Sequence, residues 1–468
     1  MIDVEYKWVV LMVTTVGSFL TAANSGVVII ALPQILADLH ASLAEGVWMI
    51  AVYQFVITIL ALALGRFADL YGRAKLYTIG YIVFSLGTGL SAIAFSGLQL
   101  ILFRGLQGLG AAFIIVNGMS LVADAFPLHE LGMGIGVNFM ASSVGSVMGY
   151  VLGGALVTYS GWRTIFLFII AVSIFGTLWS HRRLHEVFPE FHKEPFDLSG
   201  TALYVAGLTV ILLGLTLGAV TQILNLTLLA SGFLFFMLFV FLERNLRYPV
   251  LDLGLFRNRQ FAFGNLAGLL THVSAGAFPL LVSFYLQFIR GLEPIQVGLL
   301  LLWGEIVVAV LTVLCGHLSD TYGSRPFVVG GSIIISSGLA LFSFVDRSSP
   351  TTLILGIILL LGVGRGLFGS SNAGSVMSAV VPESHGIANG VRSTVNNTAN
   401  LISVPLVTAL MTIVLPYERV LGIVTGVPFT SEVEILSFMR AISFSMLILA
   451  FPSFLATVPN LAAKSRSK

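Results

Sequence analysis

The stretch of sequence that decides the fold is GRFADLYGRAKLY, residues 65–77, which lies between two long apolar runs. It holds three basic residues and one acid, although only 9% of the chain is charged. A related stretch, GHLSDTYGSRPF, begins 251 residues later. Five residues recur at this constant offset: Gly65, Asp69, Tyr71, Gly72 and Gly80 return as Gly316, Asp320, Tyr322, Gly323 and Gly331. Such a gapless match favours an internal repeat over two unrelated turns.

The composition predicts an integral membrane protein. Hydrophobic residues make up 57% of the 468 residues and the mean hydropathy is +1.00, whereas a soluble domain is about half apolar and a quarter charged. A net charge of +2 without a basic run argues against a nucleic-acid partner. A single cysteine, Cys315, excludes an intramolecular disulfide and a cysteine-based metal centre. We expect no metal and no cofactor.

The lengths of the apolar runs predict the number of crossings. A helix needs about 20 mostly apolar residues to cross about 30 Å of hydrocarbon. By this length the sequence predicts fourteen transmembrane helices, with gaps too short for a soluble domain. The predicted spans are 8–32, 45–65, 76–96, 98–124, 131–158, 164–181, 199–220, 224–243, 260–288, 293–315, 326–345, 351–378, 386–414 and 436–457.

The repeat divides these spans into lobes. Its first copy follows the second span and its second copy follows the tenth, so the repeating unit has six helices and two helices are inserted. Parallel repeats of this kind are typical of transporter lobes. We predict an all-α membrane fold with a six-helix N-terminal lobe over 1–181, a hinge and two inserted helices over 182–258, and a six-helix C-terminal lobe over 259–468.

The basic residues predict the orientation, because cytoplasmic loops carry an excess of Lys and Arg. With both termini in the cytoplasm, fifteen of the 23 Lys and Arg residues fall on the cytoplasmic side. Trp8 and Trp179 then lie at the inner interface, and Trp48 and Trp162 lie at the outer one, as indoles prefer. We expect a multi-pass protein of the cell membrane with both termini cytoplasmic.

These motifs resemble those of the major facilitator superfamily. GRFADLYGRAKL is similar to the signature loop of that family, G-x-L-x-D-R-x-G-R-[KR], with Gly65, Asp69, Gly72 and Arg73 in place. LFRGLQGLGAA, residues 102–112, resembles its second motif. The resemblance extends over essentially the whole chain.

Two further stretches resemble the fourteen-helix drug:proton antiporter branch, namely FDLSG (196–200) and LERNLRYPVLDLGLFRNRQF (242–261). The resemblance implies a monomeric secondary transporter, not an enzyme. It would move small amphipathic compounds out of the cell by alternating access, in antiport with protons.

Two positions depart from that branch. ANSGVVIIALP (23–33) has Asn24 where the branch has Asp, and an amide cannot carry a proton. GSVMGYVLGG (145–154) has Tyr150 where the branch has Pro. The alternative is therefore proton-coupled uptake, or facilitated transport, of an organic anion or lipid-like solute. A membrane-embedded enzyme or a non-transporting receptor is a more distant alternative, since the chain has no HExxH, GxSxG or Walker motif.

The charges in the opening stretch predict a conformational latch. Asp69 can pair with Arg73 and can face the positive N-terminus of a helix of the other lobe. The resemblance implies that this helix is the one over 386–414, and that the contact forms in one transport state and breaks in the other. The candidate latch residues are Gly65, Asp69, Gly72, Arg73, Asp320 and Gly323. The alternative is a simple topology signal, although such a signal needs no acid.

Ionisable residues inside a membrane span are costly and are functional candidates by default. The one carboxylate deep in a predicted span is Glu305, and His272 lies at a similar depth. We predict that Glu305 and His272 carry the coupled protons. The candidates for contact with substrate or with the central cavity are Asn24, Arg104, Gln107, Tyr150 and Arg365.

Each of these roles has a structural alternative. Glu305 would form a permanent ion pair with Arg365 or Arg104, which breaks only at a large cost. His272 would do no more than bond a backbone carbonyl, and Arg104 would shape the cavity without touching substrate.

Overall fold

The computed structural model describes most of the chain. The described residues are 4–41, 43–186, 196–216, 222–244, 246, 250–251, 253–292, 294–416, 419–420, 423, 429 and 431–462. The predicted hinge therefore lies partly outside them, at 187–195.

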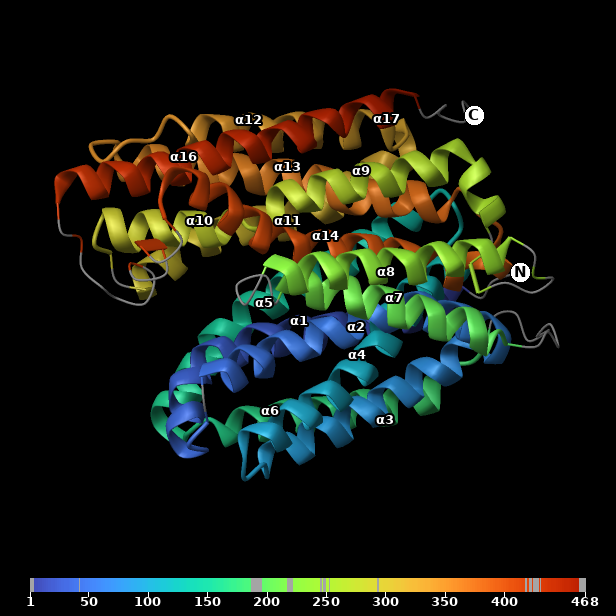
Figure 1. Ribbon diagram of the computed structural model, residues 1–468. Helices are drawn as coiled ribbons and strands as arrows, with labels where there is room; N and C mark the ends of the chain where they lie inside the picture. Colours follow the sequence, from blue (N-terminus) through green and yellow to red (C-terminus); the bar gives the residue numbers. More distant parts are fainter. Residues whose placement is uncertain are drawn as a thin grey trace.

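The helices fall into two bundles with a helix pair between them (Figure 1). The first bundle contains α1 (Val4–Asp38), α2 (Leu43–Tyr71), α3 (Arg73–Ala92), α4 (Gly97–Ala125), α5 (Leu131–Ser160) and α6 (Arg163–Arg183). The pair is α7 (Leu198–Thr216) and α8 (Gln222–Glu243). The second bundle contains η1 (Leu253–Arg257), α9 (Arg259–Gly276), α10 (Phe278–Phe284), η2 (Tyr285–Ile289), α11 (Pro294–Tyr322), α12 (Arg325–Phe342), α13 (Thr351–Met377), η3 (Pro382–Ser384), α14 (His385–Val414), α16 (Glu432–Leu455) and α17 (Thr457–Ala462).

Each predicted span coincides with helix in the described residues, and the predicted all-α membrane fold is confirmed. The predicted span over 260–288 is made of α9, α10 and the π-helical turn η2 in succession. Within the described chain, eleven helices are long and apolar enough to cross a membrane, and α7 and α8 add two shorter apolar helices. The lobe boundaries at 181 and 259 stay a prediction.

Two pairs of helices make the most extensive contacts between the bundles. α2 packs against α14, and α5 packs against α11. Under the offset of the repeat, α2 corresponds to α11, and the same order of helices makes α5 correspond to α14. The two junctions are therefore equivalent by the internal repeat. α7 packs against α2 and α14, and the buried Tyr204 hydroxyl lies 3.0 Å from Thr394 Oγ1.

The junctions lie toward one end of the molecule, which we call the terminal end because α1 begins and α17 ends there (Figure 1). Gly65 of α2 meets Gly386 of α14, and Gly132 of α5 meets Gly316 of α11. A Cβ on any of these glycines would overlap with backbone of the opposite helix. Only residues without a side chain permit this approach, as in small-residue contacts between membrane helices.

We expect Gly132→Val to force α5 away from α11. Overpacking of a close contact costs about 1–3 kcal/mol, so the junction should open more often. Cys315, the one cysteine of the chain, is 5% exposed and lies next to Gly316, so its labelling by N-ethylmaleimide reports this opening.

The labelling rate should rise about tenfold in the Gly132→Val variant. The matched control is Gly356→Val, because a Cβ on Gly356 has nothing within 4 Å. Equal labelling rates in the two variants would show that the approach of α5 and α11 does not depend on this glycine.

Candidate functional site

The turn after α2 sets up the first junction. α2 ends at Tyr71, and Gly72 has a φ of 103°, which L-residues with a side chain rarely adopt. The chain then enters α3 at once, so Asp69 in the last turn of α2 and Arg73 in the first turn of α3 are close neighbours. The second copy is built alike, since α11 ends at Tyr322 and Gly323 has a φ of 83°.

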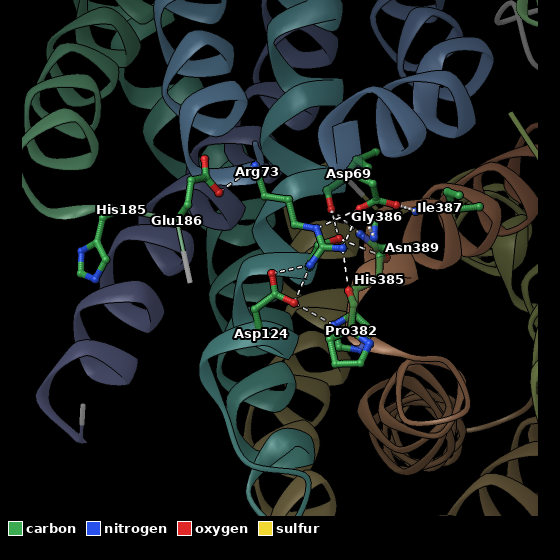
Figure 2. A network of polar contacts seen from close by, with 12 residues as sticks. Asp69, Arg73, Asp124, His185, Glu186, Pro382, His385, Gly386, Ile387 and Asn389 are labelled. Carbon is green, nitrogen blue, oxygen red and sulfur yellow. Dashed lines mark hydrogen bonds and ion pairs between the residues drawn. The ribbon is translucent and has the colours of Figure 1, made fainter. Parts of the chain in front are cut away.

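Asp69 caps a helix of the other bundle (Figure 2). Its Oδ1 accepts the backbone N–H of Gly386 and its Oδ2 accepts that of Ile387, both at 2.9 Å. These amides belong to the first turn of α14, which has no intrahelical acceptor for them and carries the positive end of the helix dipole. A buried carboxylate is therefore well matched to this position.

Arg73 holds Asp69 in place (Figure 2). Its Nε and Nη2 donate to Asp69 Oδ1 at 2.9 and 2.6 Å, and its Nη1 donates to both oxygens of Asp124 at 2.5 Å. Nη2 also donates to the Pro382 carbonyl at 2.7 Å, directly before α14. One buried guanidinium thus joins α2, α4 and the segment that leads into α14.

His385 adds a second contact across the junction. Its Nδ1 lies 2.9 Å from Asp124 Oδ1, and both side chains are about 5% exposed. Its backbone carbonyl accepts the Ser120 hydroxyl at 3.2 Å. The buried group thus contains two acids, one arginine and the His385 imidazole.

Asp320 repeats the capping contact in the opposite sense. Its two oxygens accept the N–H groups of Gly132 and Met133, at 2.8 and 3.1 Å, in the first turn of α5. Each bundle thus caps a helix of the other. The second copy has Ser324 at the position that Arg73 occupies in the first copy. At this position Asp320 therefore has a serine instead of an arginine.

The carboxylate deep in the second bundle is paired. Arg365 Nη1 of α13 donates to Glu305 Oε1 of α11 at 2.5 Å, and the side chains are 37% and 26% exposed. The exposed apolar residues of α11, which include Trp303, Ile306 and Val310, lie on another side of the helix. The pair is therefore partly open and does not face the lipid-exposed side of α11. Of the two partners predicted for Glu305, Arg365 pairs with it among the described residues, whereas Arg104 contacts Met49 and Gln107.

Arg104 lies in the first bundle with a different set of neighbours. It is fully buried, donates to the Met49 carbonyl at 3.2 Å and to Gln107 Oε1 at 2.6 Å, and lies 4.7 Å from the centre of the Tyr53 ring. Gln107 in turn donates to Asn24 Oδ1 at 3.1 Å. Asn24 and Gln107 thus act here as hydrogen-bond partners within one polar cluster.

The remaining candidates are placed as follows. His272 of α9 lies near the Asn400 side chain and within electrostatic reach of Arg365. Among the described residues, His272 makes no direct hydrogen bond or ion pair with Glu305. The Tyr150 side chain lies outside what the structure describes. No group of three or more His, Cys, Asp or Glu side chains that could hold a metal ion occurs among the described residues.

Sequence reasoning missed Asp124, His385 and Asn389. Asp124 and His385 stand at the ends of apolar runs, where a charged residue also fits a plain membrane boundary. Asn389 Nδ2 donates to the carbonyls of Val116 and Ile115 in α4, at 2.7 and 3.3 Å. The signal that could have found Asp124 is the excess of three basic residues over one acid in residues 65–77, which calls for a further acid.

Known proteins are similar to this chain along most of its length. The riboflavin transporter RibZ of Clostridioides difficile is 27% identical over 393 residues, 84% of this chain and 86% of that protein. The multidrug resistance protein Stp of Mycobacterium tuberculosis is 31% identical over 391 residues, 82% of this chain and 72% of that protein.

A solved structure shares the fold. The human organic anion transporter MFSD10 superposes with a TM-score of 0.68 and covers 97% of this chain and 99% of its own, at 13% identity. That identity shows the fold alone. The model of the Major Facilitator Superfamily matches residues 14–258 and 264–431. This chain therefore belongs to the Major Facilitator Superfamily, and it is a transporter rather than an enzyme.

Proposed function

We propose that this transporter exports small amphipathic compounds from the cell in exchange for protons. The observation that carries the proposal is the partly open Glu305–Arg365 pair inside the second bundle. The names of several relatives agree with export, among them the multidrug resistance protein Stp and a tetracenomycin C resistance and export protein from Streptomyces glaucescens.

We infer from the excess of basic residues that the terminal end lies in the cytoplasm and that the transporter lies in the cell membrane. The junctions at this end are closed, so this arrangement corresponds to the outward-facing state. The contacts of Asp69 and Asp320 then act as a latch on the cytoplasmic side. They would break when the lobes separate there to admit substrate, and we expect one chain to suffice for the cycle.

Coupling follows from the two charge states of Glu305. The ionised form holds Arg365, whereas the protonated form releases this guanidinium to other partners. A proton and a substrate that favour different charge states of one pair are thermodynamically linked. Asn24 cannot replace Glu305 in this role, because its amide does not titrate. His272 lies within electrostatic reach of Arg365 and is the candidate relay.

We predict that Glu305→Gln abolishes transport against a gradient and keeps substrate binding and downhill exchange. The glutamine copies the protonated acid, so proton binding can no longer change the pair. The measurement is flux of a panel of fluorescent amphipathic compounds in vesicles of purified protein with an imposed proton gradient.

Glu432→Gln is the matched control for this prediction. Glu432 also pairs with an arginine, Arg347, but both side chains are more than half exposed at the surface. This variant should transport like the wild type, since exposed ion pairs contribute little. Concentrative transport by Glu305→Gln at the wild-type rate would make Glu305 structural, and His272 would become the proton site to test.

A second prediction concerns the latch. Asp69→Asn should open the cytoplasmic end more often, because loss of one partner of a buried charge network costs about 3–5 kcal/mol, and less where water enters. Asp320→Asn should have a smaller effect, since Asp320 lacks the counterpart of Arg73. Spin labels at the exposed Lys75 and Val458, on opposite bundles, report the separation by double electron–electron resonance.

Glu383→Gln is the control for the latch variants, because Glu383 is an exposed acid next to Pro382 at the same junction. Its distance distribution should match that of the unmutated labelled protein. If Asp69→Asn also leaves the distribution unchanged, the charged turn serves only as a topology signal.

A further inference from the structure

Arg392 of α14 is a buried charge without a compensating acid. It is 8% exposed, and its Nε donates to Asn389 Oδ1 at 3.0 Å. Among the described residues, no carboxylate lies within salt-bridge distance of it and no acceptor is present for its Nη1 and Nη2 groups. A guanidinium is always charged and has five N–H donors. Burial of such a group without partners is costly, so its retention calls for a ligand.

The position of Arg392 connects it to the closed junction. Asn389, which accepts from Arg392, donates across the lobe boundary to Val116 of α4. One turn earlier in α14, Gly386 and Ile387 are capped by Asp69. Arg392 therefore lies directly behind the latch, at the boundary between the lobes. A ligand bound there would meet α14 at the point where the helix must move.

A second observation at this place is a group of buried polar atoms without partners. They lie on three helices that pack together, α9, α13 and α14. The unpartnered atoms are Thr271 Oγ1 of α9, Asn372 Oδ1 of α13, and Ser393 Oγ and Asn396 Oδ1 of α14. Buried polar groups are nearly always hydrogen-bonded, so such a cluster indicates a missing polar ligand or ordered water.

The side chains of Asn372 and Asn396 lie close to each other beside α9. The point where a Cβ of Gly268 would lie is 2.7 Å from Asn396 Oδ1 and 3.5 Å from Asn372 Nδ2, so the two amides meet over this glycine. Arg392 and Asn396 are four residues apart and lie on one face of α14. His272, one turn after Gly268, is within electrostatic reach of both Arg392 and Arg365.

Arg104 and Arg365 differ from Arg392 in their partners. Arg104 is equally buried, but it has a backbone carbonyl, an amide oxygen and the face of a tyrosine ring as partners. Arg365 has Glu305. Arg392 has one amide oxygen. Of Arg104, Arg365 and Arg392, Arg392 has the largest unmet demand for negative charge.

We propose that Arg392 binds an anionic group of the transported solute, and that hydrogen-bond donors of the same solute reach the unpartnered oxygens of Asn372 and Asn396. The inference rests on the proposed transport function and names its substrate class as organic anions that carry hydroxyl or N–H groups. Arg392 is hydrogen-bonded to Asn389, which in turn contacts α4 of the other lobe. Binding of the anion to Arg392 would therefore change how readily the latch opens.

The test uses two probes of nearly the same shape, the anion 4-hydroxybenzoate and the uncharged 4-hydroxybenzamide. Their binding to the purified full-length protein is measured by calorimetric titration. The wild type should bind the carboxylate about tenfold or more tightly than the amide, which is the expected effect of one charged hydrogen-bonded pair. Arg392→Gln should remove the difference, and Arg392→Lys should keep part of it.

Arg257→Gln, at an exposed arginine of η1, controls for the change in net charge and should bind both probes like the wild type. Equal binding of the two probes by the wild type, no binding of the carboxylate, or an unchanged preference in Arg392→Gln would each overturn the inference. Bound 4-hydroxybenzamide in the Gln variant shows that this variant is folded. If it does not fold, loss of the preference in Arg392→Lys decides against a charge-based site.

Transport is measured separately in vesicles, with the uncharged solute riboflavin and with the anion 4-hydroxybenzoate. If riboflavin moves but the protein binds the two probes equally, the anion site is contradicted and the transport proposal stands. Anion binding that depends on Arg392, without movement of any solute, would contradict the transport proposal and leave the anion site standing.

Discussion

The capping of a helix in one bundle by an acid from the other is the interaction on which the rest of the structure depends. Asp69 reaches the first turn of α14, and Asp320 reaches the first turn of α5. Each contact satisfies backbone N–H groups that the helix itself cannot satisfy, and each places a negative charge at the positive end of a helix dipole. Because the two acids are related by the internal repeat, the terminal end is closed by two equivalent devices.

Glycines make these contacts possible. Gly65 and Gly386 bring α2 and α14 together, and Gly132 and Gly316 do the same for α5 and α11. A carboxylate can bond the N–H groups of a helix terminus only when the backbones are this close. In each junction, the close packing at glycine and the capping of a helix terminus by an acid therefore depend on each other. Apolar side chains also pack across the same boundary, since Ile387 and Val391 of α14 belong to the buried cluster that contains Leu62 of α2.

The fold could be predicted almost completely from the sequence, because bilayer thickness sets the length of a span and the repeat sets the division into lobes. The contact of Asp69 with the helix that begins near Gly386 could be expected from the resemblance. Asp124 and His385 could not, since a charge at the end of a span fits either a buried network or a membrane boundary. Arg392 lies inside the predicted span over 386–414, but only the structure shows which acceptors it has.

The central claim is that the latch opens and closes in each transport cycle. Hydrogen–deuterium exchange of the backbone amides of Gly386 and Ile387 in vesicle-bound protein tests it most directly, because these amides are protected only while Asp69 caps them. The amides of Gly132 and Met133, capped by Asp320, provide the second reading. We predict that all four amides exchange faster under conditions of active transport than in the resting protein. The exchange rate should rise by a similar factor for each of them. Protection equal to that of the middle of α14, unchanged by transport, would contradict the account.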